Sequence, residues 1–176
     1  ALGAGGMGAC LLVRARSSDD ERHYVLKLPQ RTSAQYRSWF RREALALLSL
    51  ADHPHRGIVR LVSFHDGLGG KPHLVMEWVD GESLQDRLER APFPLGEGLR
   101  ILAELASAVA HAHHQGIGHY DIKPANVVLH MGAEPVLVDW GIAGATCRSR
   151  VGTPPYLAPE RILEDRLTAP LASDVF

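Results

Sequence analysis

The sequence has few of the features that mark several large classes of protein. It has only two cysteines, Cys10 and Cys147, whose separation fits neither a metal site nor a redox pair, so we predict no disulfide framework and expect a reducing compartment. Its formal net charge is only -1, which indicates no nucleic-acid or membrane-surface partner. No run of apolar residues approaches the roughly 18 that a membrane span needs. We therefore expect a cytoplasmic location for these residues, and we assign any membrane anchor to a segment outside them.

The composition is otherwise that of an ordinary globular protein. Of the 176 residues, 45% are hydrophobic and 22% are charged, which is enough for one sizeable core or two small lobes. The sequence starts without Met and within a glycine-rich motif. We expect it to be a fragment of a longer chain and, by itself, to be weakly folded and inactive.

One stretch carries most of the chemistry. It reads His-Tyr-Asp-Ile-Lys-Pro-Ala-Asn from position 119, and Asp-Trp-Gly follows from position 139. The two segments supply the carboxylates of Asp121 and Asp139, the amide of Asn126 and the ammonium of Lys123. An isolated Asp or Asn in a loop usually forms a turn. Together, however, these groups are the set that holds a metal-bound triphosphate beside a hydroxyl group, so they predict phosphoryl transfer.

A glycine-rich motif lies at the start of the chain. Gly3, Gly5 and Gly8 form G-x-G-x-x-G, with Gly6 as an extra glycine. Such a backbone can turn sharply and place its N–H groups against phosphate oxygens. The motif alone is weak, since an ordinary glycine-rich turn explains it about equally well. A dinucleotide-binding unit would need a helix next, but residues 10–16 have the composition of a strand.

A buried ion pair is predicted between the next strand and the first helix. Residues 23–28 alternate as a strand, and a lysine such as Lys27 in a strand is usually solvated. The following segment, 33–50, has apolar residues at helical spacing, and Glu43 lies on that apolar stripe. A buried carboxylate needs a cation, because an unpaired buried charge is very costly. We therefore predict that Lys27 pairs with Glu43.

The remaining elements follow from periodicity and from turn residues. The predicted strands and helices are 58–65, 74–79, 127–130 and 135–138 for strands, and 83–90 and 95–115 for helices. Ser83 is the predicted N-cap of the first of these helices, and Gly116 follows the end of the second. The predicted buried face of the second helix consists of Leu99, Leu102, Ala106, Val109 and Ala110.

The motifs together resemble those of the protein kinases. The glycine-rich motif, Lys27, Glu43 and the two central segments are followed by Gly-Thr-Pro-Pro-Tyr-Leu-Ala-Pro-Glu from position 152, in the order that this family has. The opening glycines and Asp-Ile-Lys-Pro-Ala-Asn look like the bacterial serine/threonine branch. The resemblance covers nearly the whole chain. It implies an α+β, bilobal fold: an N-lobe at 1–79 with an antiparallel sheet and one helix, and a partial, mostly helical C-lobe at 80–176.

The resemblance also implies a role for each candidate site residue. Asp121 would accept the proton of the substrate hydroxyl, Lys123 would offset charge on the phosphate, and the hydroxyl of Thr153 would contact both. Asn126 and Asp139 would hold Mg²⁺ or Mn²⁺. Residues implied to bind the cofactor ATP are Gly3, Gly5, Gly6, Gly8, Cys10, Val25, Lys27, Glu43, Met76, Glu77, Val79 and Val128.

Three further residues are implied to be structural. His119 and Trp140 are expected to pack and to position the loops of Asp121 and Asp139, with Trp140 at a position where the family usually has phenylalanine. Asp174 is expected to anchor the loop of Asp121.

The implied function is transfer of the γ-phosphoryl group of ATP to serine or threonine hydroxyls of a protein substrate. Lys123 and Thr153 favour these hydroxyls over that of tyrosine. A nucleotide-binding pseudokinase or interaction module is the alternative. A protein without catalysis, however, has no chemical need for all five of Lys27, Glu43, Asp121, Asn126 and Asp139. A small-molecule phosphotransferase would share the central loop, but the Ala-Pro-Glu ending at 158–160 and Lys123 disfavour it.

The departure at Tyr120 generates a prediction about phosphorylation. The family usually has an arginine directly before the catalytic aspartate, and that arginine pairs with a phosphorylated residue of the activation loop. Tyr120 has no positive charge, so we expect activity not to depend on phosphorylation at Thr146 or Ser149. The tests are phosphatase treatment of the full-length protein and the double change Thr146→Ala, Ser149→Ala. A loss of turnover of about tenfold or more in either would contradict the prediction.

Overall fold

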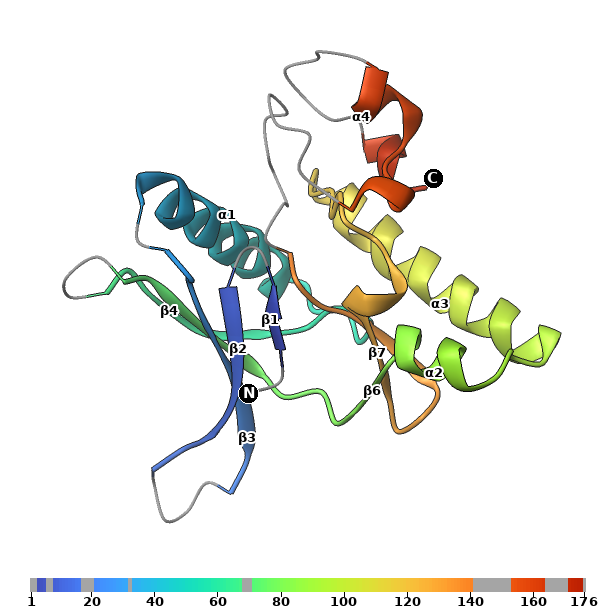
Figure 1. Cartoon of the computed structure of the whole chain (residues 1–176), viewed down its shortest axis with the longest axis horizontal. Helices are drawn as coiled ribbons and strands as arrows, with labels where there is room; N and C mark the ends of the chain where they lie inside the picture. The colour runs from blue at the N-terminus through green and yellow to red at the C-terminus, as the bar shows by residue number, and fades with distance from the viewer. Residues whose placement is uncertain are drawn as a thin grey trace.

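The computed structural model describes residues 3–5, 8–16, 21–31, 33–67, 71–140, 153–163 and 171–175. The fold is α+β, as predicted, and its elements form two groups that meet in the middle of the molecule (Figure 1). One group is an antiparallel sheet with a single long helix, and the other is a small sheet with most of the remaining helices.

The first group is a five-stranded antiparallel sheet in the order β1-β2-β3-β5-β4. Its strands are β1 (Gly3–Gly5), β2 (Gly8–Arg14), β3 (His23–Leu28), β4 (Leu61–His65) and β5 (His73–Glu77). Helix α1 (Ala34–Ala51) packs against β4 and β5, and it buries Phe40 and Leu47 on the face turned to the sheet. Because β3 lies at the centre, a side chain on its buried face is enclosed by neighbouring strands and by α1.

The second group is built on a three-stranded sheet in the order β6-β7-β8. These strands are β6 (Gly81–Ser83), β7 (Val127–His130) and β8 (Glu134–Leu137). The helices and turns that surround it are α2 (Leu84–Arg90), α3 (Leu95–His114), η1 (Pro124–Asn126), η2 (Pro154–Tyr156), α4 (Pro159–Leu163) and η3 (Leu171–Asp174). The segment 119–126 leads directly into β7, and Asp139 lies two residues after β8. Both therefore lie at the open end of the β7–β8 hairpin.

A shared core joins the two groups. One buried cluster contains Leu47 and Met76 from the first group together with Leu105 and Trp140 from the second. The backbone adds to this contact, because the N–H of Val59 donates to the carbonyl of Leu137 at 3.0 Å. The loop after α1 is thereby fixed to β8, which holds the two sheets in one arrangement.

The predicted ends of the helices are confirmed. The side chain of Ser83 accepts a hydrogen bond from the N–H of Asp86 at 3.0 Å, as expected of the N-cap of α2. Helix α3 runs over Leu95–His114, and Gly116 follows it with a φ of 72°. A left-handed residue directly after a helix is where glycine is strongly favoured.

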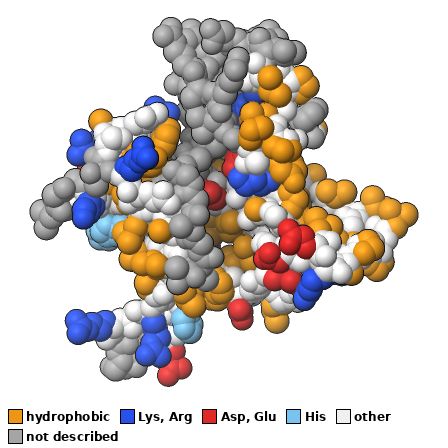
Figure 2. Space-filling model, in the orientation of Figure 1, with side chains coloured by type: hydrophobic (Ala, Val, Ile, Leu, Met, Phe, Trp, Pro, Cys, Tyr) orange, Lys and Arg blue, Asp and Glu red, His pale blue; other side chains and the backbone are white. Residues whose placement is uncertain are grey.

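The predicted buried face of α3 is wrong. Leu99 and Leu102 are 57% and 62% exposed, Ala106 and Ala110 are also exposed, and Val109 is only partly buried. The residues that are buried instead are Ile101, Leu105, Ala108 and Ala112. The helix has apolar residues on more than one side, so helical spacing alone does not choose between the stripes. Contact with β8 does choose, and Figure 2 shows apolar side chains left on the surface over this helix.

Close packing at Gly81 leads to a stability prediction. A Cβ atom added to Gly81 in β6 would overlap the carbonyl of Leu129 in the neighbouring strand, and backbone cannot yield cheaply. We expect Gly81→Ala to lower the free energy of unfolding by about 1–3 kcal/mol, the usual cost of overpacking. Gly96→Ala in α3 is the matched control, since no atom lies within 4 Å of the added carbon.

The measurement is thermal unfolding of the full-length protein and both variants. Gly81→Ala should melt at a lower temperature, and Gly96→Ala should melt at or above the parent temperature because alanine favours a helix. Equal melting temperatures for the two variants would show that the β6–β7 contact is not as tight as described.

Candidate active site

Lys27 lies at the centre of a buried charge cluster. Its Nζ atom is 2.7 Å from both carboxylate oxygens of Glu43 and 2.6 Å from Oδ1 of Asp139. Lys27 and Glu43 are 3% and 1% exposed, whereas the side chain of Asp139 is 37% exposed. The predicted pair of Lys27 and Glu43 is present. The cluster joins β3, α1 and the residue that follows the β7–β8 hairpin.

The electrostatics of the cluster differ among its three members. Burial alone would lower the pKa of Lys27, but the carboxylates of Glu43 and Asp139 outweigh it and hold that pKa well above its usual value. Burial raises the pKa of Glu43, with Lys27 opposing the rise. Burial acts the same way on Asp139, yet the nearby Lys27 ammonium wins and lowers its pKa. Asp139 is therefore an anion with part of its carboxylate open to solvent.

A second polar cluster surrounds Asp121. Residues 119–126, which we name the catalytic loop after the role predicted for them, bring Lys123 Nζ to 2.7 Å and Asn126 Nδ2 to 3.0 Å from Oδ2 of Asp121. Thr153 donates to Oδ1 from its backbone N–H at 3.0 Å and from its hydroxyl at 2.9 Å. Lys123 also donates to the Thr153 hydroxyl at 2.6 Å. The four residues predicted to be catalytic thus lie together, and Thr153 makes both contacts that the resemblance implied.

The catalytic loop is anchored by Asp174, as expected. Asp174 accepts the N–H of His119 at 2.7 Å and the N–H of Tyr120 at 2.5 Å. His113, at the end of α3, donates to the same carboxylate at 2.9 Å. A single carboxylate thereby ties η3 and α3 to the residues directly before Asp121.

His119 and Trp140 pack together below the two loops, as expected. Both are 1% exposed or less, and their ring centroids are 4.7 Å apart at an angle of 60°. Nε2 of His119 donates to the carbonyl of Val138 at 3.1 Å, and Nδ1 accepts the N–H of Asp121 at 3.3 Å. Burial lowers the pKa of His119, which agrees with a neutral ring that donates on one side and accepts on the other.

Two of the three non-glycine residues with a left-handed backbone in the described part of the chain lie in these loops, and the third, Met131, lies between β7 and β8. Tyr120 and Asp139 have φ angles of 65° and 61°, in the left-handed region that residues other than glycine rarely adopt. Such residues cost roughly 1–3 kcal/mol each and persist only where the surroundings hold them. Both belong to the loops of the candidate site, and one directly precedes Asp121.

The structure describes most, but not all, of the residues predicted to bind the nucleotide. Gly6 lies outside the described residues. The others lie in β1, β2, β3, α1, β5 and β7 or just after β5. Across the first sheet Cys10 is opposite Lys27, and Val25 is opposite Met76. Cys10, Val25 and Met76, which are predicted to contact the nucleotide, therefore lie near Lys27 on the sheet.

Other residues predicted to bind the nucleotide lie near the junction of the two groups of elements. Glu77 is the last residue of β5, Val79 packs on the shared core, and Val128 is half-buried in β7. Gly3 and Gly5 form β1, whose partner strand β2 begins at Gly8.

The donor set suits a divalent cation that is also held by phosphate. Among the described residues, no three His, Cys, Asp or Glu side chains are grouped as a complete metal site. Asp139 has a partly exposed carboxylate, and Asn126 uses its Nδ2 as a donor to Asp121, so the amide oxygen is the atom of Asn126 that could serve as a metal ligand. A cation such as Mg²⁺ usually keeps water and phosphate ligands and needs only one or two groups from the protein.

Two contributors to the site were not predicted from the sequence. The bond of Asp139 to Lys27 was missed, although both had been assigned to phosphate and metal, which was a signal that they lie close together. The bond of His113 to Asp174 was also missed. The helix dipole already accounts for a histidine in the last turn of a helix, so His113 did not indicate a partner distant in sequence.

Membrane insertion is not indicated by the helices. None of those in the described part of the chain has both the length and the hydropathy of a membrane span.

Comparison with known proteins identifies relatives. A family model described as "Protein kinase domain" matches residues 1–176. Serine/threonine-protein kinase pkn2 of Myxococcus xanthus is 39% identical over 174 residues, which cover 91% of this chain and 20% of that protein. PknB of Mycobacterium leprae is 32% identical over 191 residues, with 99% and 29% covered. PknF of Mycobacterium tuberculosis is 34% identical over 185 residues, with 94% and 37% covered. The chain thus spans well under half the length of these relatives.

Proposed function

The chain belongs to the protein kinase family, and from that premise we propose that its protein transfers the γ-phosphoryl group of ATP to serine or threonine hydroxyls of protein substrates. The family uses ATP and a divalent metal. The observation that carries the proposal is the contact of Lys27 with both Glu43 and Asp139, at 2.7 and 2.6 Å. This contact brings Lys27, the residue proposed to bind the phosphates, next to Asp139, a residue proposed to bind the metal.

The nucleotide is proposed to lie between the glycine-rich motif and the junction of the two sheets. Lys27 would contact its phosphates, and the backbone N–H groups around Gly3, Gly5, Gly6 and Gly8 would cover them. The adenine would lie among the residues near the end of β5. These are Cys10, Val25, Met76, Glu77, Val79 and Val128.

The metal is proposed to be Mg²⁺, with Mn²⁺ as a substitute. Asn126 and Asp139 would hold it, and when bound it would neutralise charge on the phosphates. The support is the donor set, since an amide oxygen and a carboxylate are the oxygen ligands that these hard cations prefer.

Asp121 is proposed to orient the substrate hydroxyl and accept its proton. Several donors already converge on this carboxylate, among them Lys123 at 2.7 Å and the Thr153 hydroxyl at 2.9 Å. Lys123 would shift toward the transferred phosphate and offset its charge. The names of the relatives, all serine/threonine-protein kinases, support that substrate class over tyrosine.

The two groups of elements are proposed to be the two lobes, at 1–79 and 80–176. The first sheet and the second sheet fall on opposite sides of this division. The scarcity of cysteine favours a reducing compartment, so we propose a cytoplasmic location for this part of the protein. A pseudokinase is the weaker alternative, because a protein without catalysis has no chemical need for the polar groups of Asp121, Asn126 and Asp139 together.

The test removes single charges in the full-length protein. Lys27→Met and Asp139→Asn should each lower turnover at least about a hundredfold, because the first removes a cation beside the phosphates and the second weakens the site proposed for the metal. Lys71→Met is the matched control, since Lys71 is exposed. Turnover is measured as transfer of labelled phosphate from ATP to a generic protein substrate.

Near-parental turnover in Lys27→Met or Asp139→Asn would show that the roles are wrongly assigned. No transfer by the parent protein, with nucleotide binding intact, would instead support the pseudokinase.

A further inference from the structure

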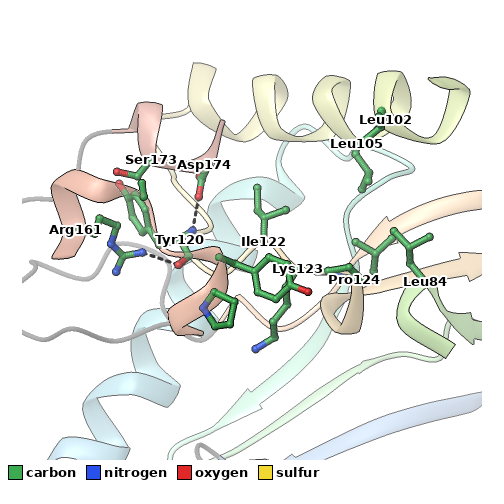
Figure 3. A pocket seen from close by; sticks show the side chains of 14 residues that line it. Leu84, Leu102, Leu105, Tyr120, Ile122, Lys123, Pro124, Arg161, Ser173 and Asp174 are labelled. Carbon is green, nitrogen blue, oxygen red and sulfur yellow. Dashed lines mark hydrogen bonds between the residues drawn. The ribbon is translucent and has the colours of Figure 1, made fainter. Parts of the chain in front are cut away.

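Arg161 is a buried arginine outside every motif discussed so far. It lies in α4, is 7% exposed, and lines one end of a cavity bordered by α3, the catalytic loop and η3 (Figure 3). Arginine is almost never fully buried unless its charge is paired or hydrogen-bonded. The position of Arg161 therefore calls for an explanation.

The guanidinium of Arg161 contacts Tyr120 in two ways. Nη1 donates to the backbone carbonyl of Tyr120 at 2.6 Å in a buried hydrogen bond. The guanidinium carbon is also 5.2 Å from the centroid of the Tyr120 ring, within the range of a cation–π contact. A charged donor makes the shorter and stronger kind of hydrogen bond. One side chain of α4 thus holds both the backbone and the ring of Tyr120.

Tyr120 is held from its other sides as well. Its N–H donates to Asp174 at 2.5 Å, and its ring lies so close to Gly118 that a Cβ atom there would overlap it. The ring is 9% exposed, and the φ angle of 65° is one that tyrosine does not adopt without support. The carbonyl held by Arg161 and the N–H of Asp121 belong to one peptide group. Arg161 therefore fixes the peptide plane from which Asp121 extends.

Two of the segments around Tyr120, α4 and η3, are also joined directly to each other by neighbouring residues. The hydroxyl of Ser173 donates to Glu160 at 2.7 Å. Glu160 precedes Arg161 in α4, and Ser173 precedes Asp174 in η3. Tyr120 thus has the cation of α4 at its carbonyl and the anion of η3 at its N–H, while α4 and η3 also bind each other.

We propose that Arg161 is a positioning residue that holds Asp121 in its working orientation by clamping Tyr120 to α4. The inference rests on the proposed function. Tyr120 carries no charge, so the cation at this point of the catalytic loop comes from α4 instead. A guanidinium is always protonated in proteins, so the charge of the clamp does not change with pH. Lys27, proposed to bind the phosphates, belongs to the other charge cluster with Glu43 and Asp139, so we expect nucleotide affinity to be independent of the clamp.

The test compares Arg161→Met with Arg90→Met in the full-length protein. Arg90 is the matched control because it forms an exposed ion pair with Glu82 at 2.6 Å in α2 and β6. Arg161→Met should lower kcat at least about tenfold while the Kd of ATP–Mg²⁺ stays within about twofold, since orientation of Asp121 is lost and the phosphate contacts are not. Arg90→Met should leave both unchanged. A parental kcat in Arg161→Met overturns the proposal, and so does a weakening of ATP binding equal to the loss of kcat.

Arg161→Lys keeps the test decisive if Arg161→Met does not fold. Lysine retains the charge and a donor but not the planar group over the ring. We expect kcat to fall by about three- to tenfold, again with unchanged ATP affinity. A parental kcat in Arg161→Lys would overturn the role of the planar contact and with it the clamp.

A readout without activity separates this proposal from the proposed function. Amide hydrogen exchange in residues 118–123 should be at least about tenfold faster in Arg161→Met than in the parent, because the clamp is gone. Unchanged exchange overturns the proposal. If the parent protein transfers no phosphate but exchange still accelerates, the clamp stands and the proposed function fails.

Discussion

The buried ammonium of Lys27 is the interaction on which the rest of the structure depends. A charge this deep in a protein is costly unless it is paired, and here Glu43 and Asp139 both pair with it. Each partner comes from a different element, so compensating the charge also fixes α1 and the end of the β7–β8 hairpin against β3. The requirement to neutralise one cation therefore organises the junction of the two sheets. The hydrophobic core that passes through the same junction gives this arrangement its rigidity.

The catalytic loop depends on a comparable use of charge. Tyr120 has a strained backbone, and the loop keeps it because Asp174 and Arg161 bind its two backbone groups. Asp121 then receives donors from Lys123 and Thr153 in a fixed geometry. Both loops of the site are thus held by ionic side chains distant in sequence, rather than by their own local propensity.

A contact could be predicted from the sequence where a physical requirement left only one candidate residue to meet it. Glu43 on an apolar stripe demanded a cation, and Lys27 was the available one, so the pair was predictable. The buried face of α3 was not, because apolar residues occur on several sides of that helix and only the position of β8 decides among them; Leu102 is exposed for this reason. Arg161 gave no signal, since an arginine in a short helix is usually solvated. Its burial follows from tertiary contacts that no local pattern contains.

The measurement that tests the central claim most directly is a double-mutant cycle between Lys27→Met and Glu43→Gln, read as the free energy of unfolding of the full-length protein in urea. If the two groups form a buried pair, each single change leaves a charge poorly compensated, and the double variant should be more stable than the sum of the single losses predicts, by at least about 1 kcal/mol. Losses that add to within roughly 0.5 kcal/mol would contradict the account, because independent sites behave in that way.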